Sequence, residues 1–333
     1  KFIVQSTEEV FAVFSLGCAE DINDAVSSAK KAFENWAFSS KEERLKYLED
    51  LYILYKKRWA DMAKAISLEM GAPIDFSTKL QAGTGASHIK SYIRVLKEYT
   101  FEDILNEDAP NNKILHEPKG VCALITPWNW PMNQVCLKVI PAIATGCTMV
   151  LKPSEIAPLS SMILAEMINE IKLPKGVFNL VNGDGAVTGN ALTSHPDVNM
   201  ISFTGSTRAG ALISQNAAND FKRVSLELGG KGANIIFKDA DAEAVERGAL
   251  RCFRNTGQSC NAPTRMLVEK SMYEEVVERV KNLANSVKID AGKNGLVDNS
   301  GTINVSSSTG KAGSVEVTGK EISIQSGSNI LAK

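Results

Sequence analysis

The sequence predicts an α/β fold in which a parallel sheet carries helices on its faces. Short apolar runs recur between Val121 and Lys288, and stretches with helical periodicity separate them. Such alternation is typical of parallel strands joined by helical crossovers, which place functional loops at the carboxyl ends of the strands. We therefore expect the chemistry of the protein at the strand-to-loop edge of this sheet.

Length and composition restrict the class of protein. A chain of 333 residues is long for one compact core, so we expect two domains or one large α/β unit. Hydrophobic residues make up 44% of the chain, charged residues make up 23%, and the net charge is -1. This balance gives no electrostatic reason to expect nucleic acid or an anionic membrane as a partner. Small molecules and further copies of the chain are the expected partners.

The cysteine pattern favours a reducing, cytoplasmic setting. Six cysteines are spread along the chain without the spacing of a metal site, so we expect no bound metal, and they are sparse for a disulfide scaffold. No apolar run reaches the ~18 residues that a membrane-spanning helix needs. The start of the sequence, KFIVQSTEEV, lacks the apolar core of a secretory signal.

The first part of the chain has helical periodicity. One predicted helix covers residues 21–37, where small and apolar residues recur every three or four positions. A second covers residues 39–71, with Ser40 and Glu43 as a capping box at its start and Gly71 as its stop signal. We therefore expect two amphipathic helices before the sheet.

A hairpin arm is expected near residues 100–118, where Pro110 and two asparagines separate short apolar runs. This arm leads into a series of predicted strands with the sequences VCALIT, CTMVLK, VFNLV, MISFT, RVSLEL and ANIIF. Helical stretches such as PLSSMILAEMINEI and DAEAVERGALRCF lie between them. The order of these elements supports the α/β prediction.

A charged pair follows the second predicted strand, in the sequence KPSE. Lys152 and Glu155 suit the hydroxyl groups of an adenosine ribose, and an acidic residue in that role favours NAD over its 2′-phosphate analogue. Taken alone, a solvated pair of loop residues is the simpler interpretation.

Two glycines lie between a predicted strand and a predicted helix, in FTGSTRAG. Gly205 and Gly210 let the backbone approach a pyrophosphate, and the helix N-terminus offers free N–H groups. The pattern is not the three-glycine dinucleotide fingerprint, so a simple turn explains it equally well.

Cys260 is a candidate nucleophile that needs an activating group, since a free thiol is mostly protonated at neutral pH and most cysteines are inert packing. Glu227 ends a strand before two glycines, where partial burial would raise its pKa toward that of a general base; an exposed glutamate is the plainer interpretation. Asn129 is either a side-chain donor for an oxyanion or a turn residue. Three histidines lie outside the strand-end motifs and are expected to be structural or on the surface: His88, His116 and His195.

Five motifs in one order make the pattern specific. TPWNWP, GCTMVLKPSE, SFTGSTRAG, LELGGK and NTGQSC follow one another at intervals that resemble the NAD(P)-dependent aldehyde dehydrogenase superfamily, over residues 8–289. The resemblance implies a Rossmann-type parallel sheet, an aldehyde as substrate, and NAD as cofactor with NADP as the alternative. PWNWPMNQ and GQSCNAPTRM resemble bacterial members that act on aliphatic aldehydes or semialdehydes.

The resemblance also implies a domain division. Residues 1–228 would form an NAD-binding domain, whose arm near 100–118 would join subunits into a homodimer or homotetramer. Residues 229–293 would form part of a catalytic domain that carries the nucleophile. Residues 294–333 are rich in serine and glycine and would form a β-type tail that we expect to be foreign to the family.

The implied reaction converts an aldehyde into a carboxylic acid. Cys260 attacks the aldehyde to give a thiohemiacetal, whose oxyanion the Asn129 side chain and the Cys260 N–H group stabilise. Hydride passes to the nicotinamide, and a water activated by Glu227 hydrolyses the resulting thioester. The implied cofactor-binding residues are Thr126, Pro127, Trp128, Lys152, Ser154, Glu155, Gly205, Ser206, Gly210 and Leu228. The implied lining of the aldehyde tunnel is Trp130, Asn133, Leu137, Ser259 and Asn261.

The chain departs from the family near Asn294. It contains no Glu-x-Phe-Gly-Pro stretch for the nicotinamide ribose and no strand to receive a partner's arm, which would weaken the oligomer. Its tail instead resembles the repeats of filamentous haemagglutinin-type adhesins. We expect a truncated catalytic domain joined to unrelated sequence, with weak or absent turnover. The alternatives are an NAD-binding fragment without catalysis and an adhesin-like binding module.

Overall fold

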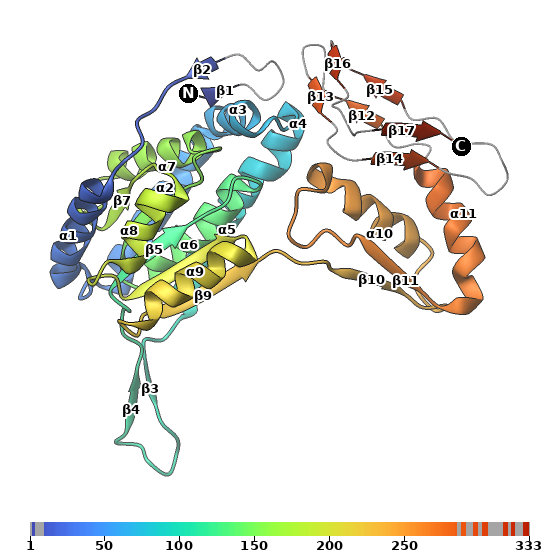
Figure 1. The fold of residues 1–333 in the computed structure, drawn as a ribbon. Coiled ribbons are helices and arrows are strands. Elements are labelled where there is room, and N and C mark those ends of the chain that lie inside the picture. The colour runs from blue at the N-terminus through green and yellow to red at the C-terminus, as the bar shows by residue number, and fades with distance from the viewer. Residues whose placement is uncertain are drawn as a thin grey trace. The chain divides into compact units, whose positions relative to one another are not determined.

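The computed structural model divides the chain into two compact units (Figure 1). Unit 1 comprises Lys1–Phe2 and Ala12–Leu228, and unit 2 comprises Ile3–Phe11 and Gly229–Lys333. Each unit has its own hydrophobic core. The structure describes residues 10–284 with their side chains and, as strands only, residues 2–3, 288–290, 296–298, 302–305, 316–318, 321–323 and 329–332.

Helices form the first part of unit 1. In chain order they are α1 (Ala19–Trp36), α2 (Lys41–Lys57), α3 (Trp59–Met70), α4 (Ile74–Phe76), η1 (Ser77–Gln81) and α5 (Ala82–Glu98). Ser40 caps α2, because its Oγ accepts the backbone N–H of Glu43 at 3.1 Å. Gly71 ends α3 with a φ of 73°, a left-handed conformation that glycine adopts without steric cost. The predicted start and stop signals are therefore confirmed.

The single helix predicted over residues 39–71 is wrong, since the structure has two helices there. Arg58 leaves the helical region, with φ of -97° and ψ of 19°. Its guanidinium group binds Asp61 at 3.3 Å and Glu166 at 2.8 Å. The apolar periodicity continues through this break, so the sequence pattern does not reveal it.

A five-stranded parallel sheet forms the centre of unit 1. Its strands are β5 (Val121–Ile125), β6 (Thr148–Lys152), β7 (Phe178–Leu180), β8 (Met200–Gly205) and β9 (Arg223–Leu228). They lie in the order β7-β6-β5-β8-β9, so the direction of strand addition reverses between β5 and β8. The first five predicted strands are confirmed. The sixth, ANIIF, forms β10, which pairs with β11 in unit 2.

Helices cover both faces of this sheet. The core on one face includes residues of α1, α8 (Asn190–Ser194) and α9 (Thr207–Ala218). The core on the other face includes residues of α2, α3, α5, α6 (Pro131–Ala144) and α7 (Leu159–Glu170). A short π-helical turn, η2 (Gly185–Gly189), precedes α8. Because β5 is buried on both faces, its sequence is a continuous apolar run.

A buried carboxylate links two helices of unit 1. Glu69 of α3 is 0% exposed and accepts hydrogen bonds from the backbone N–H groups of Leu159, at 2.6 Å, and Ser160, at 3.2 Å. The Ser160 hydroxyl donates to the same carboxylate at 2.5 Å. Burial raises the pKa of Glu69 to about 7, and these hydrogen bonds act in the opposite direction. Glu69 therefore caps the N-terminus of α7 from outside that helix.

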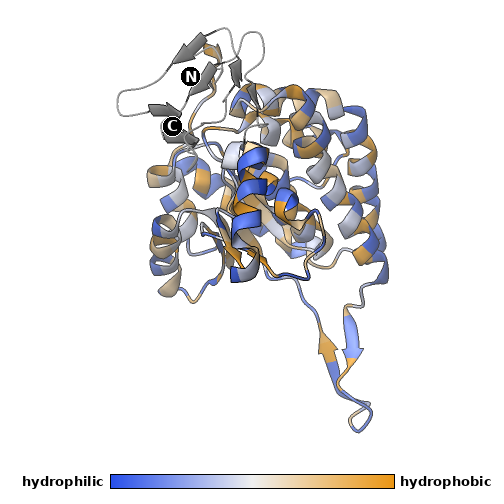
Figure 2. Cartoon of the chain, turned by 90° about the vertical axis from the view of Figure 1, so that its right-hand side faces the viewer, coloured by the Kyte–Doolittle hydropathy of each residue, from blue (hydrophilic) through white to orange (hydrophobic). Residues whose placement is uncertain are grey.

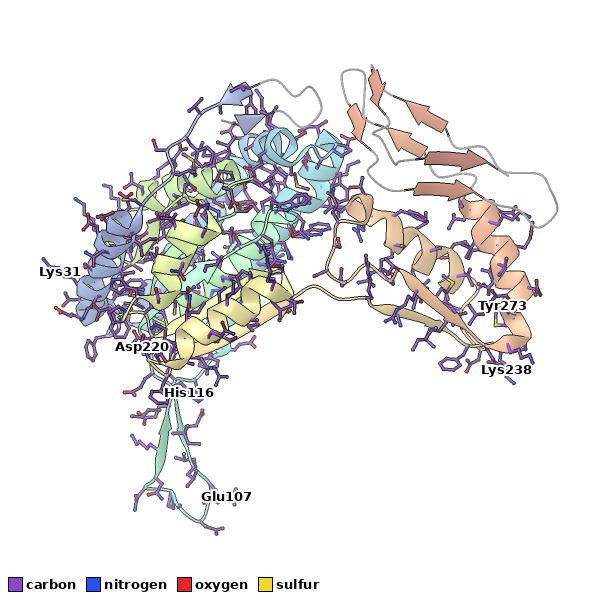
Figure 3. All side chains as sticks on the ribbon, in the orientation of Figure 1. Lys31, Glu107, His116, Asp220, Lys238 and Tyr273 are labelled. Carbon is purple, nitrogen blue, oxygen red and sulfur yellow. The ribbon has the colours of Figure 1, made fainter. Side chains whose placement is uncertain are left out.

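A β-hairpin projects from unit 1. Strands β3 (Glu102–Ile104) and β4 (Lys113–Leu115) pair antiparallel, and the hairpin carries both hydrophobic and hydrophilic segments (Figure 2). Figure 3 shows Glu107 near its tip and His116 near its base. Ile104 and Leu115 are more than half exposed, at 56% and 59%. The hairpin thus presents apolar side chains at its surface.

Unit 2 contains a small two-layer core. Strands β10 (Ala233–Ile236) and β11 (Arg265–Val268) pair in parallel, and α10 (Ala244–Phe253) and α11 (Tyr273–Ala284) supply its helices. Ile236, Val245 and Val276 form the buried centre. Two short 3₁₀ turns complete this part: η3 (Arg254–Gly257) and η4 (Lys270–Met272).

The remaining described strands are short and pair in twos. Near the N-terminus, β1 (Phe2–Ile3) pairs with β2 (Val10–Ala12). In the tail, three pairs are parallel: β12 (Lys288–Asp290) with β15 (Glu316–Thr318), β13 (Leu296–Asp298) with β16 (Glu321–Ser323), and β14 (Thr302–Val305) with β17 (Asn329–Ala332). The predicted boundaries at Glu8 and Asn294 lie outside the described residues.

None of the described helices combines the length and the apolar character that a membrane-spanning segment needs. The six cysteines are free thiols. Three of them are buried in the sheet and helices of unit 1: Cys122, Cys136 and Cys147.

Candidate active site

Most predicted cofactor residues lie at the carboxyl ends of strands of the unit 1 sheet or in the loops that follow, and Gly210 lies in α9. Loops after β5, β6, β8 and β9 begin at Thr126, Pro153, Ser206 and Gly229. In an open α/β sheet, ligands bind outside the carboxyl ends of strands where the strand order reverses. Here that reversal lies between β5 and β8. The sequence motifs and the sheet topology therefore indicate the same edge.

The loop after β5 is held by its neighbours. The Thr126 N–H group donates to the Lys152 carbonyl at 3.3 Å, and Gln81 Nε2 donates to the Asn129 carbonyl at 3.2 Å. The Thr126 hydroxyl is buried and has no hydrogen-bond partner among the residues that the structure describes. Pro131 begins α6 at a position where its missing N–H group costs nothing. The half-buried residues of the loop are Pro127, Trp128, Asn129 and Trp130.

The predicted tunnel residues of unit 1 lie along α6. Asn133 and Leu137 are four positions apart and share one face of the helix, and Trp130 immediately precedes α6 as its N-cap residue. The Trp130 ring lies 5.6 Å from the Phe76 ring, centroid to centroid. His88 Nε2 lies 2.8 Å from Asn133 Oδ1, and it donates the hydrogen bond because an amide oxygen only accepts. His88 therefore contacts this face of α6, which its position in the sequence does not indicate.

Lys152 is buried at the end of β6, with 3% of its surface exposed. Its Nζ donates to the carbonyl oxygens of Gly183, at 2.5 Å, and Pro153, at 3.1 Å. The carboxylate of exposed Glu155 lies 3.6 Å away. Burial lowers the pKa of Lys152, and the charge of Glu155 opposes that effect. Lys152 is therefore not part of a solvated loop pair. Ser154 is half-buried and Glu155 is exposed.

The loop after β8 leads directly into a helix N-terminus. Ser206 caps α9, because its Oγ accepts the Ala209 N–H group at 3.2 Å. Gly205, just before it, has no room for a side chain, since a Cβ there would clash with the Phe203 ring. The Thr204 hydroxyl is buried and, within residues 10–284, has no hydrogen-bond partner. Free N–H groups and a positive helix end suit an anionic group at this loop.

Gly210 and Leu228 contact each other. A Cβ at Gly210 would lie 2.8 Å from Leu228 Cδ2, so glycine lets α9 pack closely on β9. This packing accounts for Gly210 without a ligand. The sequence pattern, which suggested an approach to a pyrophosphate, does not distinguish the two roles.

The partial burial expected for Glu227 is wrong. Arg223, Ser225 and Glu227 alternate with half-buried residues and are all exposed. These three residues share one face of β9, and this face is exposed, whereas both faces of β5 are buried. Tertiary packing decides this exposure, and the sequence of β9 alone does not reveal it.

Lys138 is a candidate functional residue that sequence analysis missed. It lies on α6, is 8% exposed, and its Nζ donates to Ser202 Oγ at 2.9 Å. Burial lowers the pKa of Lys138 to about 8, and the negative charge of Glu227 opposes that effect. In the sequence, the feature that could have identified it is a single lysine within the apolar run VCLKVI. Lys138 therefore supplies a positive charge in the neighbourhood of Glu227.

Cys260 belongs to unit 2, where it lies at the surface of a turn. The Ala262 N–H group donates to the Ser259 carbonyl at 3.1 Å, so Cys260 and Asn261 are the two central residues of this turn. Cys260 and Asn261 are exposed, and Ser259 is half-buried. The thiol is thus accessible within unit 2.

The backbone before Cys260 is strained. Asn255 and Thr256 have φ values of 54° and 52°, and Gly257 follows with 76°. The left-handed conformation is costly for a β-branched residue such as Thr256. Asn255 is buried, and its Nδ2 donates to the Gln258 carbonyl at 3.1 Å. We call residues 255–262 the cysteine loop.

The predicted cofactor-binding residues of unit 1 thus lie near one edge of its sheet. The predicted nucleophile, Cys260, lies on the cysteine loop of unit 2. The residues at the sheet edge that combine burial, hydroxyl groups and charge are named here the carboxyl-edge cluster: Thr126, Lys152, Glu155, Thr204 and Ser206. Dinucleotide sites of α/β proteins use this combination of hydroxyl groups, a helix N-terminus and an acidic residue.

Comparison with known proteins agrees with this arrangement. The model of the family described as "Aldehyde dehydrogenase family" matches residues 1–317. The 3-succinoylsemialdehyde-pyridine dehydrogenase of a Pseudomonas species is 49% identical over 286 residues, which is 85% of this chain and 59% of that protein. The chain therefore spans about three-fifths of the length of this relative.

Solved structures are similar over the same part. An aldehyde dehydrogenase from Bartonella henselae is 57% identical, with a TM-score of 0.84, over 86% of this chain and 60% of that one. A mutant of aldehyde dehydrogenase C from Pseudomonas syringae, in complex with NAD+ and octanal, is 46% identical, with a TM-score of 0.83, over 86% and 59%. Together with the family match and the site geometry, these similarities establish that the chain belongs to the aldehyde dehydrogenase family.

Proposed function

We propose that this chain takes part in the NAD-dependent oxidation of an aldehyde to a carboxylic acid. The observation that carries the proposal is the carboxyl-edge cluster, where buried polar groups without described partners lie at the switch point of a parallel sheet. The named relatives support it, because one is a semialdehyde dehydrogenase and another was solved with NAD+ and octanal.

The residues of the cluster fit a dinucleotide. The hydroxyls of Thr126 and Thr204 are buried, and a ligand would supply the hydrogen-bond partners that residues 10–284 do not give them. Ser206 lies at the N-terminus of α9, where a pyrophosphate would meet free N–H groups. Lys152 and Glu155 would bind the hydroxyls of the adenosine ribose. Because Glu155 is an exposed carboxylate, it favours NAD over NADP, whose 2′-phosphate would meet a like charge.

Each catalytic candidate has one proposed role. Cys260 attacks the aldehyde carbon, and the side-chain amide of Asn129 donates to the oxyanion that forms. Bound NAD supplies the hydride acceptor. Glu227 takes a proton from the water that hydrolyses the thioester on Cys260. Its exposure in unit 1 suits proton exchange with solvent.

The proposed aldehyde-binding residues of unit 1 lie at the start of α6 and within that helix. Trp130, Asn133 and Leu137 offer an aromatic ring, an amide and an apolar side chain in succession. With Ser259 and Asn261 of the cysteine loop, these residues suit an aliphatic aldehyde or a semialdehyde. We propose small-molecule aldehydes as the substrates, without nucleic acid or a membrane as a partner.

We also propose that the hairpin β3–β4 is the arm that joins two copies of the chain, as a homodimer or homotetramer. Its exposed apolar residues support this role, because an isolated hairpin gains little stability from its own contacts. The six free thiols agree with the cytoplasmic setting that we retain in the proposal.

The decisive test measures the reduced cofactor that forms when the purified 333-residue chain is incubated with NAD and an aliphatic aldehyde. We expect weak turnover that Cys260→Ser abolishes and that Cys252→Ser, a nearby control, leaves unchanged. Saturable quenching of tryptophan fluorescence by NAD without turnover would favour an NAD-binding fragment. Absence of both binding and turnover in a folded sample would contradict the proposal.

A further inference from the structure

A hydrogen-bonded pair of side chains joins α5 to α6 beside the residues that we propose to bind the aldehyde. His88 Nε2 donates to Asn133 Oδ1 at 2.8 Å, and we call these two residues the His–Asn pair. The helices approach closely here, because a Cβ on Gly85 would lie 3.0 Å from Met132 Cβ. Gly85 and Met132 are buried, whereas both members of the pair are half-buried. The His–Asn pair therefore lies at the rim of the helix contact and keeps part of its surface accessible.

Packing between the two helices does not require a polar pair. Ile89 of α5 and Val135 of α6 are buried in the same apolar core, together with Cys136. Burial of these side chains stabilises the contact between the helices. A hydrogen bond between half-buried side chains adds little to it, because water competes for the same groups. Recognition of a ligand therefore explains the His–Asn pair better than helix packing does.

The amide of Asn133 has hydrogen-bonding capacity left over. An asparagine side chain carries an acceptor oxygen and an NH₂ group with two donor hydrogens. His88 fixes the oxygen on the side of α5, so the NH₂ group is turned to the other side. Among residues 10–284, the structure gives this NH₂ group no acceptor. An oxygen atom of a ligand can therefore accept its hydrogen bond.

The surroundings of Asn133 on α6 are apolar. Before it, the Trp130 ring lies 5.6 Å from the Phe76 ring, centroid to centroid. After it, Leu137 is on the same face of the helix and is 39% exposed. Small-molecule sites are mostly apolar and use a few polar groups to fix the orientation of the ligand. This face of α6 therefore suits a carbon chain that carries one polar group opposite Asn133.

The position of Asn133 in α6 restricts the length of that carbon chain. Asn133 is the third residue of the helix, and the loop that carries Asn129 precedes the helix directly. An α-helix rises about 5.4 Å per turn, so Asn133 lies within about one turn of this loop. Asn129 is the proposed donor to the aldehyde oxygen. A substrate that reaches both amides carries its second oxygen near the fourth carbon of the chain.

We propose that Asn133, held in place by His88, donates a hydrogen bond to an oxygen at the far end of the aldehyde substrate. This inference rests on the proposed function and names the substrate class of the same site. The preferred substrates are aldehydes with a ketone or carboxylate oxygen on the fourth carbon, and plain aliphatic aldehydes bind less tightly. Asn133 contacts the substrate, whereas His88 is a positioning residue that acts through Asn133.

The test compares 4-oxopentanal with pentanal and 4-oxobutanoate with butanal. Each is titrated with NAD into Cys260→Ser, which cannot form the thiohemiacetal, and tryptophan fluorescence gives the dissociation constant. In at least one pair, the oxygenated aldehyde should bind about three- to tenfold more tightly, and that pair distinguishes a ketone from a carboxylate. Equal affinities within both pairs, or no binding of any of the four, would overturn the inference. Because the readout is binding, a parent chain without turnover but with this preference would contradict only the proposed function.

Variants in the same background separate recognition from a structural role. Asn133→Leu removes the amide and should abolish the preference, while Gln134→Met, a similar change at the next position of α6, should keep it. His88→Leu should reduce the preference several-fold, and His88→Gln, whose amide can still donate to Asn133 Oδ1, should retain most of it. Should Asn133→Leu fail to fold, the two His88 variants decide. An undiminished preference in Asn133→Leu, or equal preferences in the two His88 variants, would overturn the inference.

Discussion

The carboxyl-edge cluster of unit 1 and the cysteine loop of unit 2 position their polar groups in different ways. In the cluster, the core fixes the side chains: Lys152 is 3% exposed and is held by two carbonyl groups. In the cysteine loop, the backbone fixes the position of the exposed Cys260, because consecutive left-handed residues precede it. A binding surface gains from burial, whereas a nucleophile has to remain accessible.

This difference assigns different sensitivities to the two regions. Changes in the cluster should alter ligand affinity or the stability of unit 1, because its groups are part of a packed structure. Changes in the cysteine loop should alter reactivity or local strain, with little effect on the sheet.

The largest effect is expected from Glu227→Gln. The amide cannot accept the proton of the attacking water, so turnover should fall about 100- to 1,000-fold while NAD affinity stays the same. Steady-state turnover and the intact mass of the thioester-bearing protein would measure this. Glu98→Gln, at an exposed position on α5, is the control. Unchanged turnover would show that Glu227 is not the general base and that unit 1 contributes cofactor binding only.

A large effect on stability is expected at Glu69. Glu69→Ala leaves three donors at the start of α7 without their acceptor and should lower the free energy of unfolding by about 3 kcal/mol. Glu69→Gln keeps an acceptor oxygen and should cost less. Urea unfolding of both variants measures the difference. Equal losses in the two variants would show that packing, not hydrogen bonding, decides the effect.

Glu69 also predicts a pH dependence. Its pKa in the folded protein is about 7, above the ordinary value of 4.5, so the folded state binds more protons between these two values. The stability that this group contributes is therefore fully present below pH 4.5 and is lost as the pH rises through 7. Unfolding measured at pH 5.5 and pH 8 should show this loss in the parent protein, and Glu69→Gln should lack it.

An intermediate effect is expected from Lys152→Met. Loss of the charged donor should weaken NAD binding about 10- to 100-fold, since hydrogen bonds to charged groups contribute about 1.5–3 kcal/mol. Titration of tryptophan fluorescence measures the dissociation constant. Lys90→Met, at an exposed position on α5, controls for the loss of one positive charge. Equal NAD dissociation constants in the two variants would show that Lys152 does not bind the cofactor.

The smallest effect is expected in the cysteine loop. Thr256→Gly relieves a left-handed conformation and should raise the free energy of unfolding of unit 2 by about 0.5–1 kcal/mol, after the entropic cost of glycine. Thr264→Gly, where φ is not positive, should instead lower it. Thermal unfolding followed by circular dichroism compares the two. Destabilisation by both variants would argue against strain at Thr256.

The sequence predicts the features that depend on local pattern. β5 to β9 are visible as apolar runs because most of their residues are at least partly buried, and Ser40 and Gly71 mark helix ends through local geometry. The break at Arg58 is not predicted, because the apolar periodicity continues through it and one partner of its guanidinium group, Glu166, is distant in sequence.

Features that depend on tertiary packing were not predictable. Glu227 is exposed because it lies on the face of β9 opposite its half-buried residues, which the sequence of the strand does not reveal. Lys138 is buried because α6 packs on the sheet, where Ser202 receives its ammonium group. The sequence motifs identify which residues follow strands, whereas tertiary packing decides which of them are buried.

Hydrogen exchange with and without NAD tests the central claim most directly, because it locates binding without requiring turnover. The account predicts slower amide exchange at residues 126–130, 152–156 and 204–209 when NAD is present, with no change in the hairpin at residues 102–115. Unchanged exchange in all three loops at an NAD concentration that saturates tryptophan quenching would contradict it.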